Sequence, residues 1–258
     1  MQRHLRLPLS AAILFSATLA VACGGDTSKA PAAGGAAAPV ANPVNPETAG
    51  NVTGKITFDG VAPKPEPIKM SSDPKCAADG ATAMTESIVV GDGGALQNVF
   101  VYVKDGLGNL VFPIPTTPVV LDQKGCHYEP HVFGIQVGQP LEIRNSDPTL
   151  HNVHAVAHAN QEFNTGQPIQ GMKTTHVFTA KEVLLPFKCD VHGWMNSYAG
   201  VVDHPFYAVT GADGGFSLKG LPPGTYTIDA VHERLGVQSQ TVTIGAKETK
   251  DIAFTFKG

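Results

Sequence analysis

Most of the chain consists of short runs in which apolar and polar residues alternate, and turn residues separate one run from the next. The runs are rich in Val, Ile, Thr, Phe and Tyr, and they include 52–58, 97–104, 135–144, 216–218, 225–232, 240–244 and 252–256. Asp-Gly and Pro-Gly motifs, as at 213–215 and 222–224, mark the turns. Glycine and proline, 28 and 20 of the 258 residues, disfavour long helices. We therefore predict an all-β chain of sandwich type.

Charge and hydropathy exclude two other classes of protein. The net charge is −4, which gives none of the basic excess expected of a nucleic-acid-binding domain. Hydrophobic residues make up 42% of the chain, enough for a packed core and too many for a wholly disordered protein. We therefore expect a folded protein without a nucleic-acid partner.

The first 23 residues have the features of an export signal. Arg3 and Arg6 precede an apolar run from Leu9 to Ala22, which is shorter than the about 20 residues that span a bilayer. Cys23 follows small residues and resembles the cysteine of the bacterial lipobox, whose thiol receives a lipid. The alternative is an ordinary signal that is cut near Ala22. We expect an exported protein, lipid-anchored at the cell envelope through Cys23 and facing the periplasm or the cell exterior.

A segment without folding signals follows the signal peptide. Residues 24–50 are rich in Ala, Pro and Gly and show no hydrophobic periodicity. Such a segment cannot bury enough apolar surface to fold by itself. We predict a signal peptide over 1–22 and a flexible tether over 23–50.

One short segment concentrates metal-ligand chemistry. Cys189, His192 and Met195 have the spacing Cys-x2-His-x2-Met, and His151 opens a His-Asn-Val sequence upstream. Two imidazoles, a thiolate and a weak axial thioether are the ligands of blue-copper sites. Taken singly, Cys189 would be a buried free thiol and Met195 a core residue. Their order and spacing together favour a copper site.

These motifs resemble the cupredoxin family, to which plastocyanin and amicyanin belong. The resemblance covers residues 117–204 and rests on the segments 119–122, 128–130, 137–140, 145–147 and 151–153 and on the loop that begins at Cys189. It implies a Greek-key sandwich with one mononuclear type 1 copper, bound by His151, Cys189 and His192 in the equatorial plane and by Met195 axially. It also implies that Asn152 braces the two ligand loops and donates its backbone N–H to the Cys189 sulfur.

Three further residues belong to the predicted surroundings of the metal. Phe187 and Asp190 flank Cys189, and the Asp190 carboxylate would favour the more positive, oxidised state of the site. In cupredoxins the histidine of this loop lies at an apolar patch through which electrons pass. Trp194, two residues after His192, either extends that patch as an anchor for a partner or closes the site by packing.

Other metal chemistry fits the sequence less well. A structural zinc site uses four N or S ligands, usually with paired cysteines, and a binuclear copper centre of this fold needs two cysteines in the loop. Multicopper oxidases and copper nitrite reductases need further cupredoxin domains, so we do not expect an enzyme. A second metal site remains an alternative to surface or hydrogen-bonded roles for the remaining histidines of this region. These are His127, His131, His154, His158, His176 and His204.

The C-terminal sequence resembles a second family. Residues 212–228 contain Asp-Gly-Gly-Phe and Leu-Pro-Pro-Gly-Thr-Tyr, which resemble the carboxypeptidase regulatory-like domain, a transthyretin-like sandwich. The resemblance implies two preceding strands, and the segments 54–60 and 98–103 fit them. Because these segments lie before the cupredoxin-like region, we predict one sandwich from 51–116 and 205–258, interrupted by 117–204. The alternative is two consecutive domains.

Two cysteines remain when Cys23 is assigned to lipid and Cys189 to metal. The exported compartment is oxidising, so we predict a Cys76–Cys126 disulfide, with two free thiols as the alternative.

The functional hypothesis that follows is a membrane-tethered type 1 copper protein. It would carry single electrons between redox protein partners. The alternative is a copper sensor, store or delivery protein, or an adhesion-type binding module. The sequence leaves the oligomeric state open.

Overall fold

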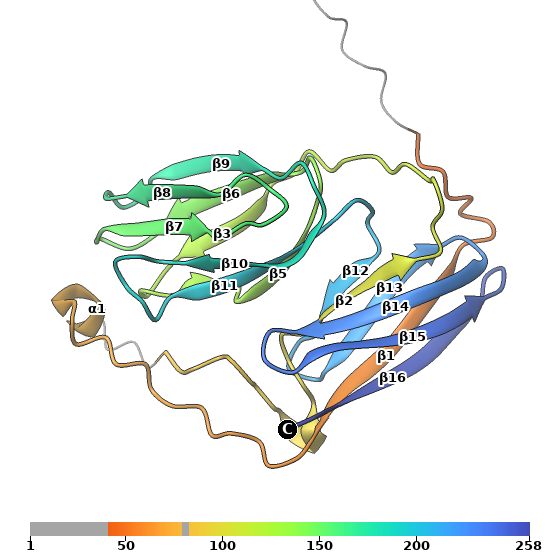
Figure 1. The fold of residues 1–258 in the computed structure, drawn as a ribbon, viewed down its shortest axis with the longest axis horizontal. Coiled ribbons are helices and arrows are strands. Elements are labelled where there is room, and N and C mark those ends of the chain that lie inside the picture. Colours follow the sequence, from red (N-terminus) through yellow and green to blue (C-terminus); the bar gives the residue numbers. More distant parts are fainter. Residues whose placement is uncertain (1–40, 79–82) are drawn as a thin grey trace, which may run out of the picture. The chain divides into compact units, whose positions relative to one another are not determined.

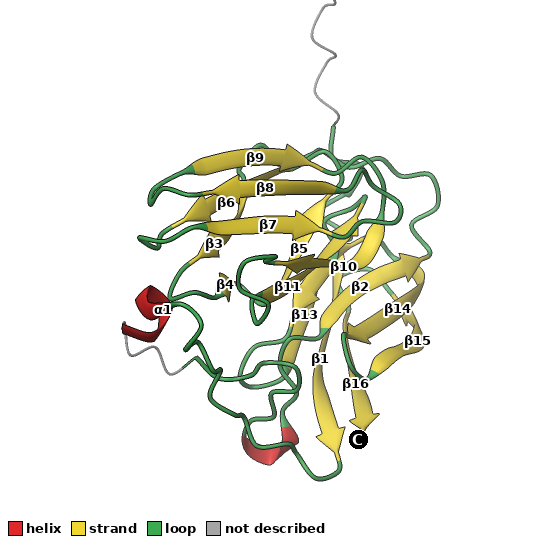
Figure 2. Cartoon of the chain, turned by 60° about the vertical axis from the view of Figure 1, so that its left-hand side comes forward, coloured by secondary structure: helices red, strands yellow, loops and turns green. Residues whose placement is uncertain are grey.

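The computed structural model describes residues 41–78 and 83–258, which belong to one compact unit (Figure 1). The predicted signal peptide, Cys23 and the tether up to residue 40 lie outside the described residues. The prediction of an all-β chain is confirmed, because the helical segments described are only α1 (Pro74–Ala78) and the 3-10 turn η1 (Asp92–Gly94), red in Figure 2. Within the described ranges, no helix has the length and apolar character needed to cross a membrane.

Two facing sheets form the first sandwich, with strand orders β13-β1-β16 and β12-β2-β14-β15. Val52 and Ile56 of β1 point inward with period two, and they pack in one apolar cluster with Val101 and Ile228 of the facing sheet. The strands are β1 (Gly50–Asp59), β2 (Phe100–Asp105), β12 (Tyr207–Val209), β13 (Gly215–Leu221), β14 (Gly224–His232), β15 (Gly236–Ile244) and β16 (Thr249–Lys257).

The first sandwich joins segments from both ends of the described chain. β1 pairs antiparallel with β13 and parallel with β16, so that Asn51 lies opposite Thr249, 198 positions later. In the other sheet β2 lies between β12 and β14. Strands that precede the cupredoxin-like region therefore share both sheets with strands that follow it.

The second sandwich has the strand orders β5-β11-β10-β7-β8 and β4-β3-β6-β9. Its core contains Tyr128 and Ile143 of one sheet and Ile135 and Phe187 of the other, all almost fully buried. The strands are β3 (Val119–Gln123), β4 (Tyr128–Glu129), β5 (Val132–Gln136), β6 (Pro140–Asn145), β7 (His151–Ala155), β8 (Phe163–Gln167), β9 (Lys173–Val177), β10 (Glu182–Lys188) and β11 (Asn196–Val202).

One predicted strand, over 135–144, is wrong, because the structure divides this run between β5 and β6. Gly138 has a φ of +85°, which favours glycine, and the N–H of Gln139 donates to the carbonyl of Gln136 at 2.9 Å. This turn sends β6 into the facing sheet. The prediction followed the alternation of apolar and polar residues over 135–144 and gave too little weight to Gly138 as a turn residue.

The two sandwiches meet at a pair of glycines. Gly134 of β5 lies opposite Gly200 of β11. A Cβ at Gly200 would lie 2.2 Å from the Phe100 ring, and a Cβ at Gly134 would lie 2.2 Å from the Tyr207 ring. The missing side chains therefore provide the space in which the aromatic rings of the first sandwich pack on the second.

The folded part begins before the predicted end of the tether. β1 starts at Gly50, the N–H of Lys247 donates to the carbonyl of Thr48 at 3.1 Å, and Val44 packs against the core of the first sandwich. The physical reason is that Val44 has an apolar side chain, whose removal from water stabilises the folded state.

Candidate metal centre

The four predicted ligands come from strand β7 and from the loop between β10 and β11. His151 is the first residue of β7, and Cys189 follows directly after β10. Within the loop, the N–H of Cys189 donates to the carbonyl of Met195 at 3.2 Å, and the N–H of Met195 donates to the carbonyl of His192 at 2.9 Å. These two bonds fold the Cys-x2-His-x2-Met segment into a tight turn.

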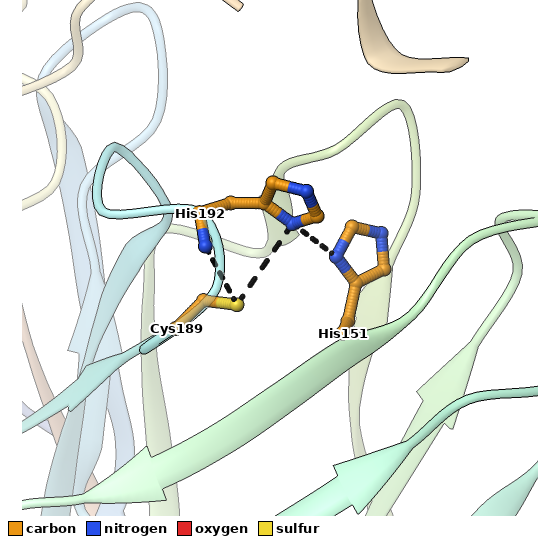
Figure 3. A group of neighbouring side chains, drawn as sticks. All are labelled: His151, Cys189 and His192. Carbon is orange, nitrogen blue, oxygen red and sulfur yellow. Dashed lines mark hydrogen bonds between the residues drawn. The ribbon is translucent and has the colours of Figure 1, made fainter. Parts of the chain in front are cut away.

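Three of the four predicted ligands converge in the interior (Figure 3). His151 Nδ1 lies 2.9 Å from His192 Nδ1, which lies 4.0 Å from Cys189 Sγ. The ligand atoms of the three residues all lie within 4.8 Å of one another. The exposed fractions are 0% for His151 and 2% for both Cys189 and His192. The structure thus brings together residues that are 41 positions apart in the chain.

A carboxylate holds each imidazole from its outer side. His151 Nε2 donates to Asp147 at 2.8 Å, and His192 Nε2 donates to Asp73 at 2.9 Å. The bond from His192 is the main cause that lowers the pKa of Asp73 to about 2. Burial raises the pKa of Asp147, but hydrogen bonds from His151 and from backbone N–H groups, including that of Cys126, bring it below its ordinary value. Both carboxylates are therefore charged at neutral pH, and they fix the Nε2 protons.

The two Nδ1 atoms lie on the ring sides away from these carboxylates, and they face each other beside the Cys189 sulfur. Three atoms that can bind a metal are thus gathered at one buried point. A metal ion bound there would replace the protons on these atoms, because imidazole and thiol ligands bind in their deprotonated forms. Two imidazole nitrogens and one thiolate sulfur are the donor chemistry that suits copper. The side chains of His151, Cys189 and His192 therefore fit a copper ion.

The surroundings of Cys189 favour its thiolate form. Burial raises the pKa of the thiol, but hydrogen bonds from His151 and from the backbone N–H groups of Asn152, His192 and Val191 bring the pKa below its ordinary value. One of these bonds, from the His192 N–H to Sγ, measures 3.3 Å. Because the thiolate is the form that binds metal, the loop backbone prepares Cys189 for coordination.

Met195 and Phe187 belong to the apolar wall of the site. Met195 has no exposed surface and lies in the same apolar cluster as Cys189. Phe187, with 1% exposed, packs against Phe133 with ring centroids 5.8 Å apart. This wall excludes water from the sulfur side of the site, which strengthens the electrostatic interactions within it.

Asn152 connects the two ligand-bearing segments. Its Oδ1 accepts the N–H groups of Asp190 at 2.8 Å and Val191 at 3.3 Å, and it lies 3.3 Å from Cys189 Sγ. Its Nδ2 donates to Asn164 on β8 at 2.7 Å. A single amide side chain therefore ties β7 to the loop that carries Cys189.

The Asp190 carboxylate lies at the surface among polar partners. It accepts hydrogen bonds from Asn164 at 2.6 Å and from His154 at 3.1 Å, and Lys188 lies 3.3 Å away. The bond from Asn164 is the main cause that lowers the pKa of Asp190 to about 2. The nearby positive charge of Lys188 offsets part of the negative charge of Asp190.

Trp194 is half-buried and packs beside the site. Its Nε1 donates to the carbonyl of Cys126 at 2.9 Å, and its ring centroid lies 5.0 Å from that of His192. Trp194 also lines a cavity of about 490 Å³, together with residues that include His131 and Tyr198. Trp194 therefore lies beside the ring of the predicted ligand His192 and beside a surface cavity, and its indole N–H fixes it in place.

The remaining cysteines and histidines lie outside the ligand group. Cys76 and Cys126 form a disulfide. Among the described residues, every close group of three or more His, Cys, Asp or Glu side chains contains His151 or His192. The additional histidines make other contacts: for example, His154 Nε2 donates to Glu162, and His127 lies 2.6 Å from Glu86.

Two functional carboxylates were not assigned a role from the sequence. Asp147 lies in the segment 145–147, which carries part of the cupredoxin resemblance, so its neighbourhood gave a signal. Asp73 lies 119 positions before His192 in a region without any motif. Aspartates in loops are usually solvated, so the sequence offered no reason to place Asp73 at the metal centre.

Comparisons with known proteins give partial similarities only. No protein-family model and no curated protein matches the chain. The copper-containing nitrite reductase of Thermus scotoductus SA-01 is similar at 19% identity and a TM-score of 0.33, over 39% of this chain and 26% of that chain, so this chain spans about a quarter of its length.

Amicyanins are also among the similar solved structures. A Cu(I) amicyanin variant has 22% identity and a TM-score of 0.30, over 34% of this chain and 85% of that chain. An oxidized amicyanin variant has 18% identity and a TM-score of 0.30, over 45% and 93%. Because these scores are low, we base the metal site on the residues of this chain alone.

Proposed function

We propose that this chain is an extracytoplasmic copper protein that carries single electrons between redox protein partners. The observation that supports this proposal most is the convergence of His151 Nδ1, His192 Nδ1 and Cys189 Sγ in a buried site, while both Nε2 atoms are engaged by carboxylates. Copper, when bound, supplies a one-electron couple. Met195 is the proposed axial ligand.

The chain's own residues would hold the same donors in both oxidation states. Thiolate and thioether suit Cu(I), and imidazole suits either state. Asp147 and Asp73 fix the orientation of the two imidazoles, and Asn152 fixes the loop of Cys189. A site whose ligands are held by hydrogen bonds moves little when its charge changes, and small movement favours rapid electron transfer.

Burial favours a carrier over an enzyme. Catalytic metal sites keep an open position that a substrate can reach. Here the exposed fractions of His151, Cys189 and His192 are at most 2%, and Met195 is fully buried. Electron transfer needs a partner close to the site, but no contact between substrate and metal.

The location and the partners follow from the N-terminal sequence and from the site. We propose that Cys23 carries a lipid that anchors the protein at the cell envelope, and that residues 24–40 let the folded unit reach redox proteins from there. Removal of residues 1–22, which contain Arg3 and Arg6 and no acidic residue, changes the net charge from −4 to −6, and this charge suits partners with a basic docking face.

Redox cycling in the presence of a Cu(I) chelator tests this function. The copper-loaded chain is reduced and reoxidised repeatedly with small outer-sphere reagents. We expect reversible one-electron cycling with the copper retained. Transfer of the copper to the chelator on reduction would contradict electron carriage and support the delivery or storage alternative.

A further inference from the structure

Part of the connection between β1 and β2, the segment Met70–Ala78, covers the candidate metal centre. His192 lies in a loop, yet only 2% of it is exposed, because the segment Met70–Ala78 packs over its ring. Asp73 accepts the Nε2–H of His192 at 2.9 Å, and Cys76 Sγ lies 3.8 Å from the same nitrogen. The outer edge of the imidazole therefore faces protein and not solvent.

This segment is attached to the second sandwich at several points. The Cys76–Cys126 disulfide is the covalent attachment, and Met70, 5% exposed, packs with both cysteines and with Trp194. Lys75 Nζ also donates to the carbonyl of Pro148 at 2.7 Å. Covalent, apolar and polar contacts thus hold Met70–Ala78 against the loops that carry the ligands.

The attached segments are linked to the two imidazoles through Asp147 and Asp73. Asp147 accepts the N–H of Cys126 at 2.7 Å with the same oxygen that accepts the Nε2–H of His151 at 2.8 Å. Asp73 accepts from His192 and also from Thr149 at 3.2 Å. Cys126 is therefore linked to His151 through Asp147, and Cys76 lies directly beside His192.

We propose that Met70–Ala78 is a built-in cap on the metal centre. In this proposal Asp73 is a positioning residue that fixes the His192 imidazole, and the Cys76–Cys126 disulfide keeps the cap closed. Reagents reach Cys189 from the His192 side only when the cap opens, and a redox partner meets the cap and Trp194 instead of the imidazole edge. The identity of the metal rests on the proposed function, but the closure of the cap is a property of the chain without metal.

Alkylation of Cys189 in the metal-free full chain tests the closure. Modification is quantified on the peptide that contains Cys189, so that Cys23 does not contribute. Opening of a closed segment becomes more frequent when a cross-link that constrains it is removed. We expect Cys76→Ser/Cys126→Ser to raise the alkylation rate at least about tenfold over the oxidised wild type.

Gly200→Ala is the matched control for general loss of stability, because it disturbs the contact between the sandwiches and leaves the cap intact. Its Cys189 alkylation should stay close to the wild-type rate. Equal rates in the wild type and the double variant, or an equal rise in Gly200→Ala, would overturn the cap.

A second measurement keeps the disulfide and tests Asp73. Asp73→Asn preserves the size of the side chain. It also keeps an oxygen that can accept the Lys75 N–H, as Asp73 does at 2.8 Å. It removes the charged acceptor of the His192 Nε2–H. We expect the imidazole ¹⁵N resonances of His192 in the metal-free protein to shift, reflecting a change in its tautomers. Asp59→Asn, at an exposed position, is the control, and it should leave the His192 resonances unshifted. Unchanged His192 resonances in Asp73→Asn would contradict the positioning role.

Both experiments separate the cap from the proposed function. A chain that binds no copper would contradict the function and leave the result for the cap unaffected. A chain that binds copper, but whose Cys189 reacts equally with and without the disulfide, would contradict the cap alone.

Discussion

At the scale of single residues, the site depends on the side chains that hold the ligands as much as on the ligands. Asp147 and Asp73 orient the imidazoles, and Asn152 joins β7 to the loop of Cys189. Such outer contacts set ligand orientation, and they affect metal affinity. Of these three residues, Asn152 is the one whose loss should lower the stability of the metal-free protein.

We expect Asn152→Ala to lower the free energy of unfolding by about 1–3 kcal/mol, because it leaves the Asp190 N–H without its acceptor and releases Asn164. Urea unfolding of the metal-free protein measures this change. Asn109→Ala, at an exposed position, is the control and should change the free energy little. A loss in Asn152→Ala no larger than in the control would refute the bracing role.

The sequence indicated the side chains that converge at the candidate site, whereas the residues behind them were only partly predictable. Cys189, His192 and Met195 lie within one short segment, where spacing itself indicates the chemistry. Asp73 approaches His192 only through tertiary structure, over 119 positions, and no periodicity or motif marks it. The sequence allowed two roles for Trp194, as an anchor for a partner or as a packing residue that closes the site. In the structure its indole N–H donates to the carbonyl of Cys126.

At the scale of elements, alternation predicted most strands of the first sandwich, and the contact between the two sandwiches depends on small residues. The predicted runs at 52–58 and 225–232 lie within β1 and β14. The run at 135–144 was predicted wrongly, because a glycine turn interrupts it. The contact between the sandwiches at Gly134 and Gly200 left no sequence signal, because a glycine in a strand has several explanations.

Gly200→Ala tests the contact between the sandwiches. The added Cβ would lie 2.2 Å from the Phe100 ring, which has no exposed surface and therefore no free space to move into. We expect a loss of about 1–3 kcal/mol in unfolding free energy, as for other overpacked cores. Gly166→Ala, in β8 of the same sheet with nothing within 4 Å, is the matched control and should be nearly neutral. Equal stability of the two variants would contradict this account.

His204, between β11 and β12, should make stability depend on pH. Its Nε2 donates to the carbonyl of Val103 at 2.8 Å, and its Nδ1 accepts the N–H of Phe206 at 3.2 Å, so the neutral ring fits the site. Burial lowers the pKa of His204 in the folded protein. Its contribution to stability is therefore present above the unfolded pKa of about 6.5 and is lost as the pH falls toward the folded pKa.

We expect the unfolding free energy to fall less steeply between about pH 7 and about pH 5 in His204→Asn than in the wild type. Urea unfolding at both pH values measures the slope. His158→Asn, at an exposed histidine, should keep the wild-type slope. An unchanged slope in His204→Asn would show that another group causes the dependence.

At the scale of the whole molecule, both sandwiches contribute residues to the candidate metal centre. The ligands lie on strands and loops of the second sandwich, while Asp73 and Cys76 belong to the connection between two strands of the first. Strands before and after the cupredoxin-like region share the sheets of the first sandwich. This topology supports the proposal that the region 117–204 is inserted into a sandwich formed by 51–116 and 205–258.

The disulfide should therefore stabilise the whole unit. It closes a loop of 50 positions, and cross-links of this kind contribute about 2–4 kcal/mol. We expect a phosphine reductant to lower the urea midpoint of the wild type and to leave that of Cys76→Ser/Cys126→Ser unchanged. A wild-type midpoint that does not respond to reduction would contradict this role.

We propose that Cys189, together with His151 and His192, binds one copper ion. Titration of the metal-free chain with Cu(II), followed by visible absorption and EPR spectroscopy, measures this binding. We predict an intense thiolate-to-copper band and narrow copper hyperfine splitting that saturate at one equivalent and are absent in Cys189→Ser. A colourless complex, or the same spectrum in Cys189→Ser, would contradict the claim.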